Sequence, residues 1–474
     1  MNEYDLIIIG GGVIGASIAR ELSRYKLRIA LVEKEAELAF GVSKSNSGII
    51  HPGTQNKPGS LKGRLCVEGN RLTRIIAKEV GVDFQAVGEL ICAFSDDDIQ
   101  NLFALKKQAE DIGVPRLEIV YKPWLKINEP NLSSEVVAAL YAPTAGIISP
   151  YRWVYDLAEN AARNGVDVFT NTKVTAIESG KVFTVHTTNA TFESRYIINA
   201  AGLYADDIAR MVGIDDFTIT ARKGEEFLLD KKREYIANHL LFPLPTKTSK
   251  GILVIKTSDG NPMVGPTAEV CESKEDLSTS DEGLAKVFAS VRRMIPAISE
   301  RDIIAYFAGL RPVAGEDFIV RHEDRVPGCI TVAGIQSPGL TAAPAIAVMV
   351  VDLLKKNGLD LKKKFFFHRH RQKTDHLFAI PFNRTKQLIQ KDPEYGDIVC
   401  RCEMVSVREI KDAIARGART LDGIKFRTRA QAGRCHGGFC TARIMKILAE
   451  ELNVPIANIT KRGMGSEMVV KERT

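Results

Sequence analysis

A glycine-rich turn between a short apolar run and a helix is the feature that most constrains this chain. Residues 4–9 are mostly apolar and β-branched, which predicts a buried parallel strand, and Gly10, Gly12 and Gly15 follow in a GxGxxG pattern. A helix is expected over 16–24, and a strand over 28–32 ends at Glu33, 23 residues after Gly10. This order predicts a βαβ unit that binds a dinucleotide.

Each residue type in this unit has a physical task. Gly10 permits the tight turn, Gly12 lets the backbone approach a pyrophosphate, and Gly15 lets the helix pack closely on the strand. The amides at the N-terminal end of the helix, together with Val13 and Ile14 in the turn before it, are expected to form the anion site.

The acid that ends the second strand bears on the choice of cofactor. Glu33 would accept hydrogen bonds from a ribose hydroxyl, and its negative charge disfavours a 2'-phosphate. This argues against NADP. Lys34, the next residue, is also expected to contact the cofactor. The motif alone leaves FAD and NAD open.

Three further segments contain small or polar residues at places where a backbone can approach a ligand. One is a polar loop, one follows a strand at 196–198, and one lies between a strand at 329–332 and an apolar helix from about residue 342. Each segment alone could be an exposed loop or a packing turn. The expected contacts are Ser43, Ser45, Asn46 and Ser47 in the first, Ala200, Ala201 and Gly202 in the second, and Gly334, Pro338, Gly339, Leu340 and Thr341 in the third.

These segments resemble the flavin-binding landmarks of the D-amino-acid oxidase-like family of FAD oxidoreductases. The matching stretches are 41–51 (GVSKSNSGIIH), 196–206 (YIINAAGLYAD) and 334–344 (GIQSPGLTAAP). The resemblance covers residues 1 to about 355 and implies that one FAD binds among them. Val174 resembles the strand residue whose backbone meets the adenine in such folds.

Two residues are candidates for the substrate side of the flavin. Arg311, in the sequence GLRP, resembles the family arginine that holds an anionic substrate, and a guanidinium suits bidentate binding of carboxylate or phosphate. His51 could take a hydroxyl proton while a hydride passes to flavin N5. The alternatives are a surface ion pair for the arginine and a purely structural hydrogen bond for the histidine. Further positive charge could come from Lys57, Lys62, Arg64, Arg222 and Lys223.

Four of the eight cysteines cluster near the C-terminus, whereas Cys66, Cys92, Cys271 and Cys329 are scattered. The cluster favours metal ligation in a reducing compartment over disulfides. Four thiolates suit a [2Fe-2S] cluster or a tetrahedral zinc ion, and a redox-active dithiol is a rarer alternative. Helices are expected over 406–416, with Ser406 as N-cap, and over 442–452. The four expected ligands are Cys400, Cys402, Cys435 and Cys440.

The segments around these cysteines resemble the bacterioferritin-associated-ferredoxin-like (BFD-like) domain. They are 398–403 (IVCRCE) and 428–440 (TRAQAGRCHGGFC). This resemblance implies a [2Fe-2S] cluster and makes zinc the lesser alternative.

The expected fold class is α/β, with a Rossmann-like FAD-binding domain, an antiparallel α+β substrate domain and a small C-terminal α-rich iron-sulfur domain. A basic linker precedes the last domain, and we expect its phenylalanines, Phe365 to Phe367, to dock on a neighbouring domain. The predicted division is 1–75, 150–215 and 310–355 for FAD, 76–149 and 216–309 for substrate, 356–390 for the linker, and 391–474 for the cluster.

The predicted activity is oxidation of a small anionic substrate, with electrons passed to an acceptor protein or subunit. The pairing of the two domains resembles the catalytic subunit of anaerobic glycerol-3-phosphate dehydrogenases, which implies sn-glycerol 3-phosphate as substrate and dihydroxyacetone phosphate as product. The stretch 47–70 resembles L-2-hydroxyglutarate dehydrogenases instead. An amino or imino acid such as proline is a third alternative, and a non-catalytic iron-sulfur redox sensor is a fourth.

Charge and hydropathy set the remaining expectations. The net charge of +7 is dilute, because 65 basic residues face 58 acidic ones, and it does not indicate nucleic-acid binding. We find no signal peptide and no apolar run of the ~20 residues that span a bilayer. We therefore expect a cytoplasmic protein, and peripheral membrane contact stays open. We also expect an oligomer.

Overall fold

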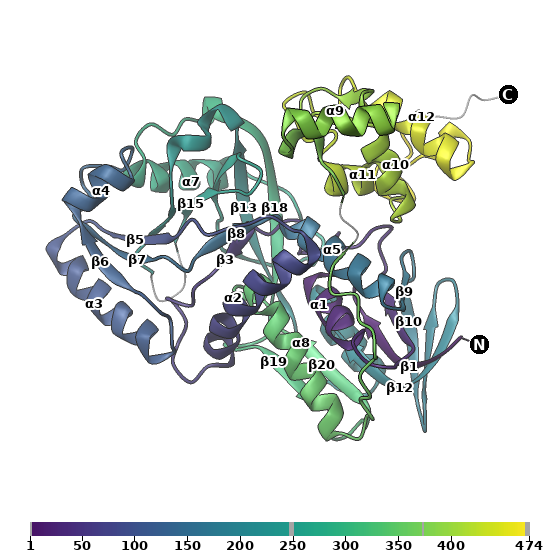
Figure 1. Cartoon of the computed structure of the whole chain (residues 1–474). Helices are drawn as coiled ribbons and strands as arrows, with labels where there is room; N and C mark the ends of the chain where they lie inside the picture. Colours follow the sequence, from purple (N-terminus) through teal and green to yellow (C-terminus); the bar gives the residue numbers. More distant parts are fainter. Residues whose placement is uncertain (1, 246–250, 372–373, 470–474) are drawn as a thin grey trace.

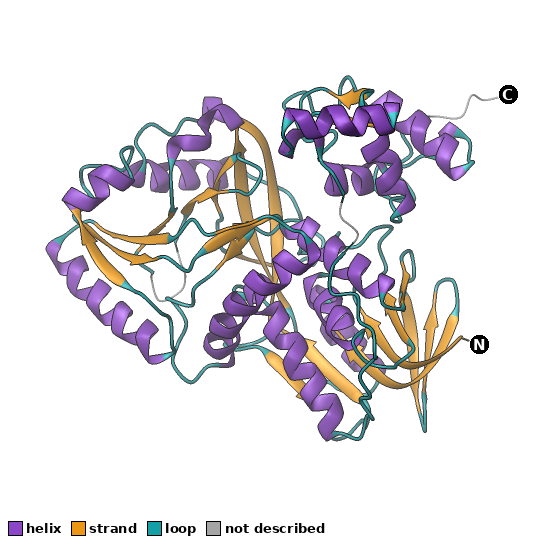
Figure 2. Cartoon of the chain, in the orientation of Figure 1, coloured by secondary structure: helices purple, strands orange, loops and turns teal. Residues whose placement is uncertain are grey.

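The computed structural model describes residues 2–245, 251–371 and 374–469. Two large sheets and the helices that pack on them make up most of the chain, and a small helical domain lies beside them near the C-terminus (Figures 1 and 2). The expected fold class is confirmed: a Rossmann-like α/β domain, a largely antiparallel α+β domain and a helix-rich C-terminal domain.

The first sheet has a parallel core, and parallel sheets are typically covered on both faces. Its central strand β1 (Asn2–Ile9) pairs in parallel with β2 (Ile29–Val32) and β12 (Thr191–Asn199), and Leu6, Ile7 and Ile8 are fully buried. The other strands are β9 (Val166–Phe169) and β20 (Cys329–Ala333), which are parallel, and β10 (Val174–Ser179), β11 (Phe183–Thr187) and β19 (Ile319–His322), which pair antiparallel.

Helices cover this sheet and begin earlier than predicted. Helix α1 (Val13–Leu22) and helix α8 (Gly339–Lys356) each start three residues before the expected position, because the backbone enters the helix directly after the N-caps Gly12 and Pro338. The remaining helices of this part are α2 (Leu61–Val80), α5 (Pro150–Arg163) and α6 (Ala205–Met211).

The second sheet is antiparallel apart from one parallel pair, β14 with β5. Its longest pair joins β13 to β18, with Arg222 opposite Arg311, and β18 runs across the expected boundary at residue 310. The strands are β5 (Glu89–Ala93), β6 (Glu118–Tyr121), β7 (Ala138–Ala142), β13 (Thr220–Leu229), β14 (Leu240–Pro243), β15 (Leu253–Lys256), β16 (Pro262–Gly265), β17 (Glu269–Cys271) and β18 (Ile303–Val313), and the helices are α3 (Asp96–Asp111), α4 (Lys122–Asn128) and α7 (Asp281–Met294).

A small third sheet fixes the segment that leads to His51. Strand β3 (Ile49–Ile50) pairs with β8 (Gly146–Ile148), which also pairs with β4 (Phe84–Gln85). Gly48 precedes β3 with φ +77°, and a Cβ there would lie 2.3 Å from the carbonyl oxygen of Ile148. Only glycine allows this approach, so the position of His51 depends on it.

The C-terminal domain has its own hydrophobic core, in which Ile410, Ile444 and Leu448 are fully buried. Ser406 caps helix α10 in a capping box with Glu409, as the sequence predicts. The elements are α9 (Phe382–Lys391), β21 (Ile398–Cys400), β22 (Val405–Ser406), α10 (Val407–Ala415), α11 (Leu421–Thr428) and α12 (Thr441–Leu452).

The linker does not dock as expected. Phe365 and Phe366 are 88% and 78% exposed, so the prediction that they pack on a neighbouring domain is wrong. The linker is held by polar contacts with α5 instead: Asn160 donates a hydrogen bond to the carbonyl oxygen of His368 at 2.9 Å, and the side chain of Arg371 lies 2.9 Å from Glu159. Phe367 does contact the neighbouring domain, because the guanidinium groups of Arg24 and Arg20 lie 4.6 and 5.8 Å from the centre of its ring.

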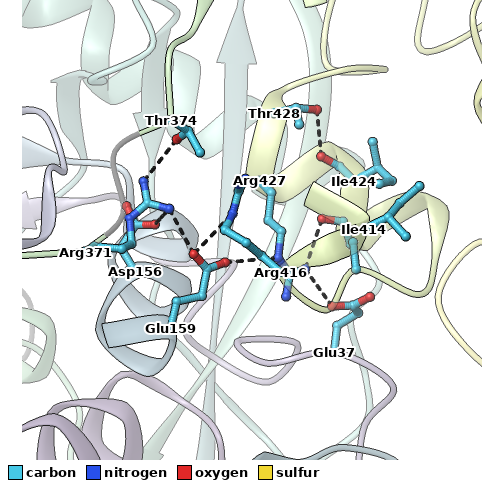
Figure 3. Close-up of polar contacts among 12 residues, drawn as sticks. Glu37, Asp156, Glu159, Arg371, Thr374, Ile414, Arg416, Ile424, Arg427 and Thr428 are labelled. Atoms are coloured by element: carbon cyan, nitrogen blue, oxygen red, sulfur yellow. Dashed lines mark hydrogen bonds and ion pairs between the residues drawn. The ribbon is translucent and has the colours of Figure 1, made fainter. Parts of the chain in front are cut away.

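A cluster of charged side chains joins the C-terminal domain to α5 and to the loop after β2 (Figure 3). Glu159 of α5 contacts three arginines, Arg371 at 2.9 Å, Arg416 at 3.3 Å and Arg427 at 3.4 Å. Asp156 lies 3.1 Å from Arg371, and burial raises the pKa of its carboxyl to about 6 although that arginine opposes the shift. The domain is therefore docked through a desolvated ionic interface.

In the part of the chain that the structure describes, none of the helices combines the length and apolarity needed to cross a bilayer.

Candidate active site and cluster site

A cavity of about 1340 Å³ lies between the two large sheets. It exceeds the roughly 300–1,000 Å³ typical of small-molecule sites, so it has room for a dinucleotide and a substrate. Most residues predicted to bind cofactor or substrate line it. They are Gly10, Gly12, Val13, Ile14, Glu33, Lys34, Ser43, Ser45, Asn46, Ser47, His51, Val174, Ala200, Ala201, Gly202, Arg311, Pro338, Gly339 and Leu340, together with the additional cations Lys57, Lys62 and Arg222.

Three of the predicted cofactor residues do not line the cavity, and each has a local structural contact. A Cβ on Gly15 would lie 1.9 Å from the carbonyl oxygen of Gly10, so this glycine permits the close packing of α1 on β1. Gly334 has φ +65° and lies against Ala314. The buried hydroxyl of Thr341 accepts a 2.9 Å hydrogen bond from the backbone N–H of His51.

The β1–α1 turn presents backbone to the cavity. Gly10 has φ +112°, and a Cβ there would lie 2.4 Å from the carbonyl oxygen of Ala200. Helix α1 begins with no side-chain cap on Gly12, although the amide of Val13 donates a 2.9 Å hydrogen bond to Ser43 Oγ. The helix N-terminus therefore faces the cavity with a polar loop beside it, as a pyrophosphate requires.

Glu33 lies at the end of β2 with both carboxylate oxygens in hydrogen bonds. The amide of Gly11 donates to Oε2 at 2.7 Å and the amide of Glu35 donates to Oε1 at 2.9 Å. Burial raises the pKa of Glu33, and these two amides oppose the shift. Each oxygen keeps a further lone pair, so the carboxylate can accept a ribose hydroxyl, and the turn and Glu33 together fit the adenosine half of FAD.

His51 lies on the cavity wall between a carboxylate and a hydroxyl. Its Nδ1 is 4.0 Å from Oε2 of Glu89, a side chain that is 1% exposed, and its Nε2 is 3.4 Å from Ser337 Oγ. Thr54 donates a hydrogen bond to the other oxygen of Glu89 at 2.5 Å. A carboxylate on one side of an imidazole favours the tautomer whose other nitrogen can accept a proton. Sequence reasoning missed Glu89 and Ser337, which are distant from His51 in the chain.

Arg311 lies on β18 and lines the same cavity. Its guanidinium donates to the carbonyl oxygen of Thr267 at 3.3 and 3.4 Å. Burial lowers the pKa of Arg311, a nearby carboxylate on Glu226 raises it, and Arg222 lowers it further. A half-buried guanidinium in a concave site is suited to binding an anion. Sequence reasoning also missed Glu226.

The four clustered cysteines meet as two pairs, each drawn from both motifs. Cys402 Sγ lies 3.7 Å from Cys435 Sγ, and the buried thiols of Cys400 and Cys440 interact with each other. Across the described ranges, no group of three or more Cys, His, Asp or Glu side chains is arranged around a single metal ion. Two adjacent thiol pairs fit a cluster with two irons better than one tetrahedral ion.

The backbone around one of these thiols favours its anionic form. Burial would raise the pKa of Cys435, but hydrogen bonds from the amides of Gly437, Gly438 and Phe439, together with Cys402, lower it overall. Amide donors of this kind tune iron-sulfur sites. His436, beside Cys435, contacts the carbonyl oxygen of Ile304 on β18 at 2.8 Å. The scattered cysteines are buried or half-buried free thiols.

The fold and the cavity define a flavin enzyme. The FAD dependent oxidoreductase family matches residues 5–353, and the chain belongs to that family. The BFD-like [2Fe-2S] binding domain matches residues 398–450. The cofactors are therefore FAD and a [2Fe-2S] cluster, and an enzyme of this class needs both an oxidisable substrate and an electron acceptor.

Several individual proteins are similar to this chain. The chain is 42% identical over 467 residues to a glycerol 3-phosphate dehydrogenase of Caloramator mitchellensis, covering 98% of this chain and 97% of the relative. It is similar to the FAD-bound structure of L-alpha-glycerophosphate oxidase from Mycoplasma pneumoniae, with a TM-score of 0.75, 34% identity and coverage of 79% of this chain and 100% of that one. An L-2-hydroxyglutarate dehydrogenase of Escherichia coli is 31% identical over 304 residues, covering 62% of this chain and 71% of the relative.

Proposed function

We propose that this protein oxidises sn-glycerol 3-phosphate to dihydroxyacetone phosphate and passes the electrons to an acceptor protein or subunit. The observation that carries the proposal is the full-length similarity to a glycerol 3-phosphate dehydrogenase, which includes the C-terminal domain. The cavity supports it, because Arg311 and Arg222 lie opposite each other on paired strands and both line the wall. Two guanidinium groups suit a phosphate dianion.

Each of three residues has a separate role in the proposed reaction. Arg311 holds the phosphate, and His51 accepts the proton of the C2 hydroxyl. Glu89 keeps the imidazole in the tautomer that can do so. Bound FAD supplies the acceptor for the hydride that leaves C2.

The C-terminal domain carries the proposed route for electrons out of the molecule. Cys402 is exposed and Cys435 is half-exposed, whereas Cys400 and Cys440 are buried. One edge of the cysteine site is thus open to a second protein, and we propose that the acceptor docks there. We also propose that the protein forms an oligomer and is located in the cytoplasm.

Anaerobic absorption spectroscopy of the purified holoenzyme tests the substrate. Addition of sn-glycerol 3-phosphate should bleach the flavin band at ~450 nm, because oxidation of the substrate would reduce a bound flavin. L-2-Hydroxyglutarate and proline, added separately, should leave the band unchanged. Bleaching by either of these and not by glycerol 3-phosphate would overturn the proposal. Iron and acid-labile sulfide analysis of the same sample checks the cluster.

A further inference from the structure

Glu226 is a carboxylate buried inside the proposed substrate cavity. It lies on β13 and is 4% exposed. Its neighbours Arg222 and Gly224 point to the same face, because alternate residues of a strand do, and all three line the cavity. Across β18, the same face carries Gly309 and Arg311. Glu226 therefore belongs to the wall that holds the proposed anion site.

One oxygen of the Glu226 carboxylate lacks a hydrogen bond to the described residues. The side chain interacts with Ser47 on the polar loop and with Arg311. Its Oε2 is buried and has no hydrogen-bond partner in the described part of the chain. Buried polar atoms nearly always have a hydrogen-bond partner. An oxygen without one in the wall of a cavity is explained most simply by a hydrogen bond that it makes to a bound ligand.

The charge on Glu226 is finely balanced. Burial raises the pKa of its carboxyl to about 7, and Arg311 on β18 and Ser47 on the 41–47 loop oppose the shift. On its own strand the charged neighbour on this face is Arg222, and the titratable side chain of His51 lines the same cavity. Near neutral pH the carboxyl therefore exists in both forms.

Binding of an anion must change this balance. In the ligand-free cavity an ionised Glu226 partly compensates the charge of Arg311. A phosphate dianion on Arg311 takes over that compensation and repels a carboxylate beside it. The neutral acid suffers no such repulsion, and its O–H can donate a hydrogen bond to a substrate oxygen.

We propose that Glu226 is a substrate-binding residue that takes one proton from solvent when a polyol phosphate dianion binds to Arg311, and that its neutral acid then hydrogen-bonds the substrate. This inference rests on the proposed function, because it requires a phosphate monoester as ligand. Proton uptake by Glu226 would make substrate affinity depend on pH above neutrality. The phosphate does not contribute to this dependence, because its second pKa is about 6 and it is already a dianion there.

Calorimetry measures this proton directly. The flavin-reduced holoenzyme, which cannot oxidise further substrate, is titrated anaerobically with sn-glycerol 3-phosphate at pH 8 in two buffers of different ionisation enthalpy. Since the free carboxyl is roughly nine-tenths ionised one unit above a pKa of about 7, the wild type should take up nearly one proton per ligand. Its dissociation constant should rise about five-fold between pH 7 and pH 8.

Two variants separate Glu226 from other titrating groups. E226Q imitates the neutral acid, so it should take up almost no proton and keep a dissociation constant that does not change between pH 7 and pH 8. E226D keeps an ionisable carboxyl and should retain proton uptake. Equal uptake in the wild type and E226Q would overturn the inference and would assign the proton to another group, such as His51.

Failure of this inference is distinguishable from failure of the proposed function. If glycerol 3-phosphate does not bleach the flavin, the substrate proposal fails. If it bleaches the flavin and E226Q shows undiminished uptake, only the role of Glu226 fails. Should E226Q not retain flavin, infrared difference spectra of the wild type and E226D replace it. The band of a protonated carboxyl must grow on adding the ligand, and no growth would overturn the inference.

Discussion

Nη1 of Arg427 lies 2.9 Å from Oε2 of Glu37, and the two side chains are only 6% and 2% exposed (Figure 3). Glu37 also accepts hydrogen bonds from the amide of Arg419 at 2.9 Å and from Thr420 Oγ1 at 3.2 Å. It follows β2 by a few residues, on the segment that begins with Glu33. The cysteine domain is therefore attached directly to the loop that forms one wall of the flavin cavity.

Removal of this arginine should weaken the docking of the C-terminal domain strongly. Arg427→Ala leaves Glu37 buried without its cationic partner, and broken buried pairs cost about 3–5 kcal/mol. Urea unfolding followed by circular dichroism should show this loss, or an early separate transition of the domain. Lys286→Ala is the matched control, because Lys286 and Glu269 form an exposed pair at 3.2 Å and its loss should cost less than about 1 kcal/mol. Equal effects of the two variants would contradict the role of Arg427.

Substitution of Arg311 should reduce substrate affinity even when the positive charge is kept. Lysine cannot reproduce the two-pronged contact of a guanidinium with phosphate. Arg311→Lys should raise KM for glycerol 3-phosphate by about ten- to a hundredfold, and Arg311→Ala should lower kcat/KM by about two to three orders of magnitude. Steady-state assays with an artificial acceptor measure both. Arg71→Lys, on the exposed face of α2 in a pair with Glu68, should leave both constants unchanged.

Glu89 should affect the rate of flavin reduction more than substrate affinity. Glu89→Gln removes the charge that lies 4.0 Å from His51 Nδ1, so the imidazole loses part of its preference for the proton-accepting tautomer. Anaerobic stopped-flow reduction by glycerol 3-phosphate should slow about ten- to a hundredfold. Glu129→Gln offers a matched control, because Glu129 makes a similar buried contact with His239 at 2.7 Å. If both variants slowed reduction equally, a general structural effect would explain the result.

Glu226 should also make stability depend on pH. Its carboxyl has a pKa of about 7 in the folded chain against an ordinary value of 4.5, so the folded state holds the proton more tightly. The stabilisation from this proton is fully present below pH 4.5 and is lost as pH rises through 7. Glu226→Gln should therefore be more stable than the wild type at pH 8, by up to about 3 kcal/mol, and by less than about 1 kcal/mol at pH 5. Melting temperatures at both pH values test this, and a difference that does not change with pH would contradict it.

Local sequence patterns predict the parts of the site whose geometry is set within a few residues. The turn at Gly10 and the cap at Ser406 depend on backbone conformation and on near neighbours, so the sequence indicates both. The cysteines are recognisable from their spacing. The sequence does not indicate that Cys402 pairs with Cys435, since that pairing depends on how two loops pack.

Residues whose role depends on distant strands could not be predicted in this way. Glu226 faces the cavity because of the β13–β18 register. Glu89 on β5 and His51 after β3 belong to different sheets, so their contact depends on how these sheets pack together. A carboxylate at the start of an apolar strand was the available signal for Glu89, whereas Glu226 lies beside Glu225 in a strand that also carries charged residues and gave no such signal. The exposure of Phe365 could not be predicted either, because the packing of a linker side chain depends on how the linker lies on the rest of the chain.

Loss of one exposed cysteine should remove the cluster and leave the flavin in place. Cys402 contacts Cys435 at 3.7 Å and does not line the flavin cavity, so Cys402→Ser breaks one thiol pair without changing any cavity residue. We expect iron and acid-labile sulfide to fall to near zero while the flavin content of the purified protein stays at one per chain. Flavin bleaching by glycerol 3-phosphate should persist, and electron transfer to a protein acceptor should be lost. Cys271→Ser, at a half-buried thiol outside both sites, is the control and should keep its iron. Loss of flavin together with iron in Cys402→Ser alone would show that the two cofactor sites depend on each other.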